Sequence, residues 1–473
     1  MGMKVSALGL VLAAGLLLTA CASRPPRLLW ASEFGGTGVD DCDDIAVHES
    51  QSLLLACHSD SHDFPSAERQ RPPANRDMDA YIVKVDQRAV KVLWAVRLGG
   101  SKYDGAFRIQ LDSAGGAWVA GYTESLDFPT TANAVQKQFA GGQGDGFLAR
   151  VSAEGQLTYS TYLGGTGSDQ ATDLVSDRRT SKVYAIGMTS SSDLVQARNS
   201  YNGKEDAFLA SFDPTRSESL QVRYPGGAED EKPTALALRP DGQLVVAGYT
   251  FSKEFPVQAA FQAELRGKTN AFLARFSTGS GELLSSTFFG GNGEDSAWGM
   301  ALSQTGDIHL LGISNSSDFP TTPGAFQPKV RGGFDIFVAS FDPAVQRLRY
   351  SSCFGGSGND IAGVDGKNVT VDSQGRVWFV GMTDSQDLPL RHAHQPSFGG
   401  GDGDGVIAAL SPTGASLAYG SYHGGTGRDL LEGLFLTDGA LYATGLSFGG
   451  VLSRRPQLPH GSAANAILFR LQQ

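Results

Sequence analysis

The chain has 473 residues, of which 41% are hydrophobic, 18% are charged and 61 are glycine, and its net charge at pH 7 is -11. This composition indicates a globular protein with a core, because a disordered chain would carry fewer apolar residues and collagen would need glycine at every third position. The excess of acidic residues argues against nucleic acid as a partner, since that affinity depends on clustered cations.

The first predicted element is a leader. Lys4 precedes an apolar stretch from Val5 to Leu18 that is too short for a lasting membrane span. The stretch ends in Leu18-Thr19-Ala20-Cys21, which resembles a bacterial lipobox, the signal whose cysteine thiol receives diacylglycerol and becomes the new N-terminus. The alternative is an ordinary secretory leader with a chance cysteine at its cleavage site.

The lipobox resemblance implies a cellular location. Residues 1–20 would be a signal peptide, Cys21 the lipidated residue and residues 21–27 a lipidated linker. Two or three acyl chains, at roughly 0.8 kcal/mol per buried methylene, anchor a protein stably. Ala22 after the cysteine resembles the sorting signal for the outer membrane. We therefore expect an outer-membrane protein, held by N-terminal acyl chains on the periplasmic side or at the cell surface.

The rest of the chain is a repeat. A Gly-Gly pair closes an apolar run seven times, with first glycines 62 to 69 residues apart at positions 35, 99, 164, 226, 290, 355 and 424. Each interval predicts four short strands, called a to d here, with tight a–b and c–d turns and a long b–c loop. One such sheet cannot bury both its faces alone, and packing copies face to face around an axis gives a β-propeller.

The two ends of the repeat complete each other. Only three strands are predicted after the seventh Gly-Gly, whereas a strand at the N-terminal end has no blade of its own. We therefore predict an all-β, seven-bladed β-propeller over residues 28–473, with four antiparallel strands per blade and a last blade closed by the N-terminal strand, residues 28–36, which removes a sheet edge. The blades are expected at about residues 37–100, 101–165, 166–227, 228–291, 292–356, 357–425 and 426–473.

The units resemble the SBBP repeat family of bacterial secreted and surface proteins, whose name denotes a seven-bladed β-propeller. The matching residues are Asp-Phe-Pro-Thr-Thr-Pro-Gly-Ala-Phe-Gln at 318–327, Gly-Phe-Asp-Ile-Phe-Val at 333–338 and Tyr-Ser-Thr-Tyr-Leu-Gly-Gly at 159–165. The third and seventh repeats depart from the pattern, at Asp193-Leu194 and at residues 452–456. The resemblance covers nearly the whole chain after the leader and implies the fold, but no activity and no catalytic residues.

Three cysteines remain besides the one in the leader. Cys42 and Cys57 lie on successive predicted strands, one residue out of register, and either form a disulfide or are two packed free thiols. Cys353 takes a position where other repeats carry Tyr or Phe, so we expect it in the core.

The acidic residues that follow each Gly-Gly pair are the most regular candidates for a site. Either each one caps its turn through backbone N–H groups, or together they surround the channel mouth and attract a cation. The string Gly-Gly-x-Gly-x-Asp resembles the calcium-binding nonapeptide of β-roll toxins, but copies about 65 residues apart cannot cage an ion jointly. The residues concerned are Asp40, Asp104, Asp169, Asp230, Asp295, Asp360 and Asp429.

Two further patterns have metal-ligand chemistry, and no other cofactor is expected. His392 and His394 lie near Asp402 and Asp404 on one loop. Residues 40–44, Asp-Asp-Cys-Asp-Asp, would suit calcium if they did not simply form a solvated acidic turn.

The aromatic residues are expected to fill the blade cores rather than to serve as sugar platforms. This interpretation applies to Phe107, Trp118, Trp298 and Trp378.

The sequence contains no Gly-x-Ser-x-Gly elbow, Walker loop or His-Glu-x-x-His motif. Long b–c loops and d–a turns share one face of a propeller, and we expect any binding site there or at the channel mouth. The favoured function is a non-enzymatic, lipid-anchored module for protein interaction or adhesion, with an envelope or surface protein as partner. The alternatives are binding of glycan or cell wall, and a hydrolase or lyase with carboxylates at the channel mouth.

Overall fold

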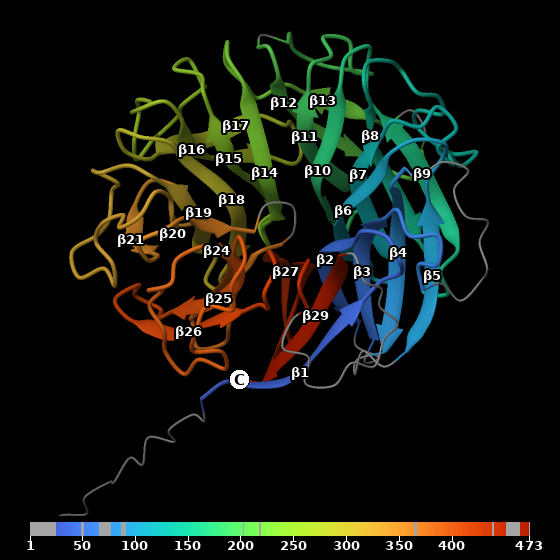
Figure 1. Cartoon of the computed structure of the whole chain (residues 1–473). Coiled ribbons are helices and arrows are strands. Elements are labelled where there is room, and N and C mark those ends of the chain that lie inside the picture. Colours follow the sequence, from blue (N-terminus) through green and yellow to red (C-terminus); the bar gives the residue numbers. More distant parts are fainter. Residues whose placement is uncertain are drawn as a thin grey trace, which may run out of the picture.

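The computed structural model describes residues 25–48, 52–65, 77–86, 91–201, 203–216, 219–363, 367–437, 439–450 and 464–472. These residues form seven antiparallel sheets arranged as blades around a central axis, without a helix (Figure 1). The prediction of an all-β, seven-bladed propeller is therefore confirmed. Within the described ranges there is no helix of the length and apolarity needed to cross a membrane. The leader and Cys21 lie outside these ranges.

The strands of each blade run outward from the axis in chain order. Blade 1 contains β2 (Asp40–His48), β3 (Ser52–Ser59), β4 (Asp79–Asp86) and β5 (Val92–Leu98). Blade 2 contains β6 (Asp104–Leu111), β7 (Ala117–Thr123), β8 (Asp145–Val151) and β9 (Leu157–Leu163). Blade 3 contains β10 (Asp169–Ser176), β11 (Val183–Thr189), β12 (Asp206–Phe212) and β13 (Gln221–Arg223). Blade 4 contains β14 (Glu231–Leu238), β15 (Gln243–Thr250), β16 (Asn270–Ser277) and β17 (Leu283–Phe289).

The last three blades include the two irregular ones. Blade 5 contains β18 (Asp295–Leu302), β19 (Ile308–Ser314), β20 (Asp335–Phe341) and β21 (Leu348–Phe354). In blade 6 the innermost strand is split into β22 (Asp360–Ala362) and β23 (Val369–Val371), which both pair with β24 (Val377–Thr383), followed by β25 (Asp404–Leu410) and β26 (Leu417–His423). Blade 7 contains β27 (Asp429–Thr437), β28 (Ala440–Ser447) and β29 (Asn465–Gln472).

The N-terminal strand closes the ring as predicted. β1 (Arg27–Phe34) is the outermost strand of blade 7 and pairs antiparallel with β29, from Arg27 opposite Gln472 to Phe34 opposite Ala466 (Figure 1). Phe34 and Ala31 are fully buried, so this strand contributes to the core as well as to the ladder. The first and last parts of the propeller are thereby held together by backbone hydrogen bonds and apolar burial.

The long b–c loops of blades 2 to 6 lie along the outer edges of their blades. In blade 2 the N–H of Thr131 donates to the carbonyl of Ser160 on β9 at 3.0 Å, and the N–H of Tyr162 donates to the carbonyl of Gln136 at 3.1 Å. The phenylalanine of the Asp-Phe-Pro sequence, Phe128, is 4% exposed and donates its N–H to the hydroxyl of Tyr162. Backbone hydrogen bonds of the same kind join the b–c loops of blades 3 to 6 to their outermost strands, so part of each of these loops satisfies the edge strand instead of standing free for a partner.

A glycine on the second strand of six blades permits close approach of the innermost strand. A Cβ atom on Gly121 would lie 2.0 Å from the carbonyl oxygen of Gly105, and equivalent glycines meet the same obstacle in the other blades. In blade 1 this position holds Cys57.

Candidate functional site

The innermost strands share a β-bulge that shapes the wall of the central channel. In six blades the register of the a–b pairing shifts at the fourth residue of the inner strand, and in blade 6 the inner strand breaks at that point. A bulge leaves one residue unpaired and re-aims its side chain. The residues at this position are Asp43, Phe107, Thr172, Thr234, Trp298, Gly363 and Glu432.

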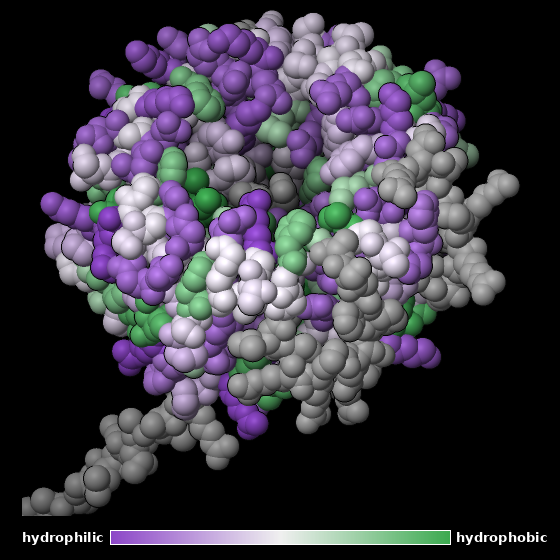
Figure 2. All heavy atoms as spheres, viewed as in Figure 1, coloured by the Kyte–Doolittle hydropathy of each residue, from purple (hydrophilic) through white to green (hydrophobic). Residues whose placement is uncertain are grey.

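A pocket of about 190 Å³ opens at the mouth of this channel. Its walls come from the innermost strands of four successive blades, β6, β10, β14 and β18, and from the second strands β11 and β15, so it lies near the axis of the ring. Phe107, Tyr249 and Trp298 form its aromatic side, and the ring centroids of the last two lie 5.4 Å apart. Figure 2 shows the molecule hollowed near its centre.

A collar of partly exposed side chains surrounds the same mouth. In every blade the penultimate residue of the second strand pairs with the second residue of the inner strand and is half-buried. Six of these seven residues are apolar or aromatic, and two of them, Met188 and Tyr249, also line the pocket. We call this set the collar: His58, Tyr122, Met188, Tyr249, Ile313, Met382 and Leu446.

Arg108, next to Phe107 on β6, bridges the inner strands of three successive blades. Its guanidinium pairs with Asp173 at 3.3 Å and donates to the carbonyl oxygen of Thr234 at 2.9 Å, so it reaches from blade 2 past blade 3 to blade 4. Arg108 is 6% exposed. Burial raises the pKa of Asp173, and the positive charge of Arg108 opposes that rise. Arg108 thus ties together the inner strands of three of the blades that line the pocket.

The acidic residues after the Gly-Gly pairs are buried and cap the d–a turns. Six of them are the first residues of inner strands, and each carboxylate accepts a hydrogen bond of 2.6 to 2.7 Å from the N–H of the second glycine of the pair. Burial raises the pKa of Asp104 to about 7. The set comprises Asp40, Asp104, Asp169, Asp295, Asp360 and Asp429, each at most 1% exposed.

In blade 4 the expectation of an aspartate at this turn is wrong. Asp230 is only half-buried, whereas Glu231 is the first residue of β14 and fully buried. Glu231 accepts from the N–H of Gly227 at 2.9 Å and from the hydroxyl of Thr250 at 2.7 Å. Glu231 follows its Gly-Gly pair at the same spacing as the capping aspartates of the other blades, whereas Asp230 stands one residue earlier.

A second set of acidic residues begins the third strands, and of these only Asp404 was a candidate from the sequence. The first residue of strand c lies across the Gly-Gly turn from the capping acid of the next blade; a Cβ on Gly164 would touch both Asp145 and Asp169. Burial and the charge of Asp169 raise the pKa of Asp145 to about 7. The set is Asp79, Asp145, Asp206, Asp335 and Asp404, with Asn270 and Asn465 in blades 4 and 7.

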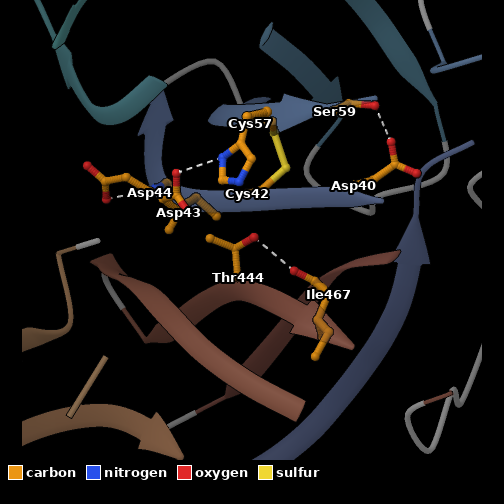
Figure 3. The surroundings of a disulfide bond; sticks show 10 residues. Asp40, Cys42, Asp43, Asp44, Cys57, Ser59, Thr444 and Ile467 are labelled. Atoms are coloured by element: carbon orange, nitrogen blue, oxygen red, sulfur yellow. Dashed lines mark hydrogen bonds and ion pairs between the residues drawn. A yellow bond between two sulfur atoms is a disulfide. The ribbon is translucent and has the colours of Figure 1, made fainter. Parts of the chain in front are cut away.

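The acidic segment Asp40–Asp44 is an inner strand and not a solvated turn. It forms the first half of β2, and its four aspartates are 0 to 7% exposed. Cys42 and Cys57 are joined by a disulfide (Figure 3). The two cysteines are direct partners in the β2–β3 ladder, and the bulge at Asp43 absorbs the one-residue offset expected from the sequence. Cys353 is buried and free.

The four residues of the histidine loop do not form a metal group within the described ranges. His394 contacts the hydroxyl of Tyr419 at 2.6 Å and Nδ1 of His423 at 3.0 Å. Asp404 is buried and accepts from the N–H of Gly399, whereas His392 and Asp402 are exposed. This pattern therefore stabilises blade 6 rather than assembling ligands.

The expected core role of the aromatic residues holds for two of the four. Trp118 and Trp378 are 4% and 0% exposed and belong to blade cores. Phe107 and Trp298 line the channel-mouth pocket, because the bulge turns both out of the regular in-and-out alternation of the strand.

Comparison with known proteins gives a shared architecture and one distant relative in sequence. No family model matches the chain. It is 23% identical over 324 residues to the regulatory protein FlaEY of Caulobacter vibrioides, an alignment that covers 64% of this chain. The chain spans about a third of the length of that relative, since the alignment covers 33% of it.

Solved structures with a similar arrangement are also distant. BamB from Moraxella catarrhalis aligns with a TM-score of 0.39 and 11% identity over 94% of this chain and 99% of that one. The β-propeller domain of the trilobed protease from Pyrococcus furiosus aligns with a TM-score of 0.43 and 8% identity over 87% and 90%. The function of this chain has to be argued from its own residues.

Proposed function

We propose that this protein is a non-enzymatic, lipid-anchored β-propeller of the bacterial envelope that binds a protein partner at its channel mouth. The main observation behind this proposal is the collar. Each blade contributes one half-buried side chain to it, and six of the seven are apolar or aromatic. These side chains surround a pocket with aromatic walls. A pocket of about 190 Å³ accepts one projecting side chain, and an apolar surround excludes water from it. A protein partner that inserts one side chain into the pocket and packs against the collar would fit this geometry.

The polar groups of the pocket favour a protein over a glycan. The hydroxyls of Thr172 and Thr234 already donate to carbonyl oxygens of the following blades, at 2.8 and 3.1 Å. Lys232 is paired with Glu205. A sugar ring presents many hydroxyls that need partners, and these groups are engaged, whereas the apolar surfaces of the collar remain available.

The carboxylates at the d–a turns do not resemble a hydrolase or lyase site. A retaining glycosidase needs two carboxyl groups about 5 Å apart in an open cleft. The acid pairs of this propeller, such as Asp145 and Asp169, are buried at blade boundaries and engaged by backbone N–H groups. These acid pairs recur in nearly every blade, which fits a structural role in stabilising the d–a turns.

The envelope location rests on the leader and on the disulfide. The lipobox pattern at residues 18–21 supplies the anchor in this proposal, and the resemblance of the units to SBBP repeats fits a surface or secreted protein. A buried Cys42–Cys57 disulfide suits an oxidising compartment such as the periplasm. A Cys21→Ala variant should leave the membrane pellet and appear in the soluble fraction, and retention in the pellet would refute the acyl anchor.

Site-specific photo-crosslinking in the native bacterium tests the partner site. A photoreactive amino acid at Met188 or Ile313, in the collar, should capture one discrete protein band. The control position is Leu93, an apolar residue on β5 that is 41% exposed and lies on the outermost strand of blade 1. Equal capture from Leu93, or capture of polysaccharide instead of protein from the collar, would contradict the proposal.

A matched pair of variants measures the contribution of the collar. Ile313→Ser removes an apolar collar side chain, and we expect capture from the Met188 position to fall at least tenfold. Leu126→Ser removes a side chain that is 70% exposed on a b–c loop, and capture should persist. If Leu126→Ser reduced capture and Ile313→Ser did not, the partner would contact the loops and not the collar.

A further inference from the structure

The seven blades provide an internal comparison for every position of the repeat. A residue that recurs in each blade serves the fold, whereas a residue found in one blade is not required by it. At the second and fourth positions of the inner strand and at the collar, blade 1 carries Asp41, Asp43 and His58. The corresponding triplets elsewhere are Gly-Phe-Tyr, Gln-Thr-Met, Lys-Thr-Tyr, Ser-Trp-Ile, Ile-Gly-Met and Leu-Glu-Leu.

The three side chains of blade 1 converge. One potential ligand atom from each of Asp41, Asp43 and His58 lies within 4.8 Å of the other two. His58 Nδ1 is 3.2 Å from Asp43 Oδ2. The fourth donor comes from blade 7, where Glu432, at the bulge position and 3% exposed, is within hydrogen-bond reach of Asp41. Donors bound to one ion at roughly 2.0 to 2.2 Å lie about 3 to 4 Å apart, so small side-chain movements complete the geometry.

An unsatisfied oxygen points to a ligand at this place. Asp41 is 7% exposed, and its Oδ1 is buried with no hydrogen-bond donor among the residues that the structure describes. A buried carboxylate oxygen without a donor is costly, and an ion is one of its ordinary explanations. Asp41 and Glu432 are also two carboxyl groups in contact, which need either a shared proton or a cation between them.

We propose that Asp41, Asp43 and His58 form a binding site for a divalent transition-metal ion at the channel mouth, with Glu432 of the adjacent blade as a further oxygen ligand. An imidazole nitrogen beside carboxylates suits Zn²⁺ or Mn²⁺ better than Ca²⁺, which takes oxygen ligands alone.

The disulfide makes the site rigid. Cys42 lies between the two aspartates in sequence, and Cys57 precedes the histidine, so the S–S bond fixes the two strands at the residues next to the ligands. Figure 3 shows Asp43 and Asp44 on one side of the disulfide and Asp40 on the other, with the contact of Asp43 drawn as a dashed line. The ligands are thus held on strands and not on a loop, which favours a defined coordination.

Equilibrium dialysis tests the site with the metal alone. The protein, purified in detergent and washed with chelator, is dialysed against ZnCl₂ or MnCl₂ and its metal content measured. We expect one ion per chain at micromolar metal, not displaced by a tenfold excess of Ca²⁺. The His58→Ala and Asp43→Asn variants should bind at least tenfold more weakly. The His62→Ala variant is the matched control, because His62 is exposed and four residues away, and it should bind as the wild type does.

Three results would overturn the site: no saturable binding by the wild type, unchanged affinity in His58→Ala, or ready displacement by Ca²⁺. A measurement on the unmodified protein covers the case in which the variants do not fold. Titration with Zn²⁺ should shift the imidazole NMR resonances of His58 and leave those of His62 in place. Equal shifts of both, or of neither, would refute the site. Because this readout does not involve the protein partner, it is independent of the proposed function.

Discussion

Replacing one buried carboxylate by its amide should stabilise the propeller above neutral pH. Asp145 accepts hydrogen bonds from Gln136 Nε2 at 3.1 Å and from the N–H of Ala140 at 2.9 Å, and it faces Asp169 across Gly164. In blade 4 the chain already carries the amide. Asn270 donates through its Nδ2 to the Asp295 carboxylate at 3.2 Å. Asp145→Asn therefore reproduces an arrangement that this protein uses elsewhere.

The structure sets the size and sign of the effect. The pKa of Asp145 rises from 3.8 to about 7 in the folded protein, and about 3 pH units correspond to an upper limit of about 4 kcal/mol. Because the folded state binds this proton more tightly, the associated stability is complete below pH 4 and is lost as the pH rises to 7. We expect Asp145→Asn to gain about 1 to 3 kcal/mol at pH 8 and close to nothing at pH 4.5.

Urea unfolding followed by tryptophan fluorescence at pH 4.5 and pH 8, at constant ionic strength, measures both values. The reverse substitution is the control: Asn270→Asp creates a carboxylate pair with Asp295, so it should lose stability at pH 8 and less at pH 4.5. If Asp145→Asn destabilises the protein at pH 8, or if its effect does not change with pH, the cost inferred for a charged Asp145, from its burial and from the charge of Asp169, is wrong.

Three other substitutions test separate parts of the structure by the same unfolding assay. Arg108→Ala should cost about 3 to 5 kcal/mol, because it leaves buried aspartates unpaired in the channel, and a cost below about 1 kcal/mol would show that the charge is solvated. Tyr162→Phe removes the hydroxyl that bonds the b–c loop of blade 2 at 2.8 and 3.0 Å, so a loss of about 1 to 3 kcal/mol is expected; no loss would mean that the loop is held by its apolar contacts alone. The double variant Cys42→Ala/Cys57→Gly carries residues that other blades have at these two positions. Removing a cross-link between residues 15 apart should lower the free energy of unfolding by about 3 kcal/mol. The same loss in the reduced wild type would confirm that the bond, not the packing, is responsible.

The architecture was accessible from sequence because it depends on spacing. The Gly-Gly pairs marked each blade, and the unpaired strand before Gly35 met a last blade that lacked one, so the pairing of β1 with β29 followed from counting. The burial of the turn acids could not be predicted from spacing alone, because the same acidic residue suits a capped turn or an exposed ring. The hydrogen bond from the second glycine, which the structure shows, decides between them.

The channel mouth was not accessible in this way, because bulges break the period of two. A regular inner strand predicts that Phe107 and Trp298 point into the blade, and the extra residue in the ladder turns them towards the axis. The same shift placed Cys42 opposite Cys57. The role of Glu231 does not depend on a bulge, because Glu231 follows its Gly-Gly pair at the same spacing as the capping aspartates of the other blades. The collar residues can be located in the sequence, since each precedes the Thr or Ser that ends a second strand. The residue type at this position differs from blade to blade, so the pattern does not stand out.

Blade 1 and its boundary with blade 7 combine features that the other boundaries lack. The ring closes through β1 on blade 7, where the two ends of the chain meet without a covalent link. The strand next to that boundary, β2, carries the disulfide in place of the small residues of other blades, together with the cluster of Asp41, Asp43 and His58. An ion shared with Glu432 would join blade 1 to blade 7 directly at the channel mouth. Metal binding should then raise the free energy of unfolding by RT ln(1 + [M]/Kd), where [M] is the concentration of free metal ion, so the stability of the closed ring would depend on the metal bound at its mouth.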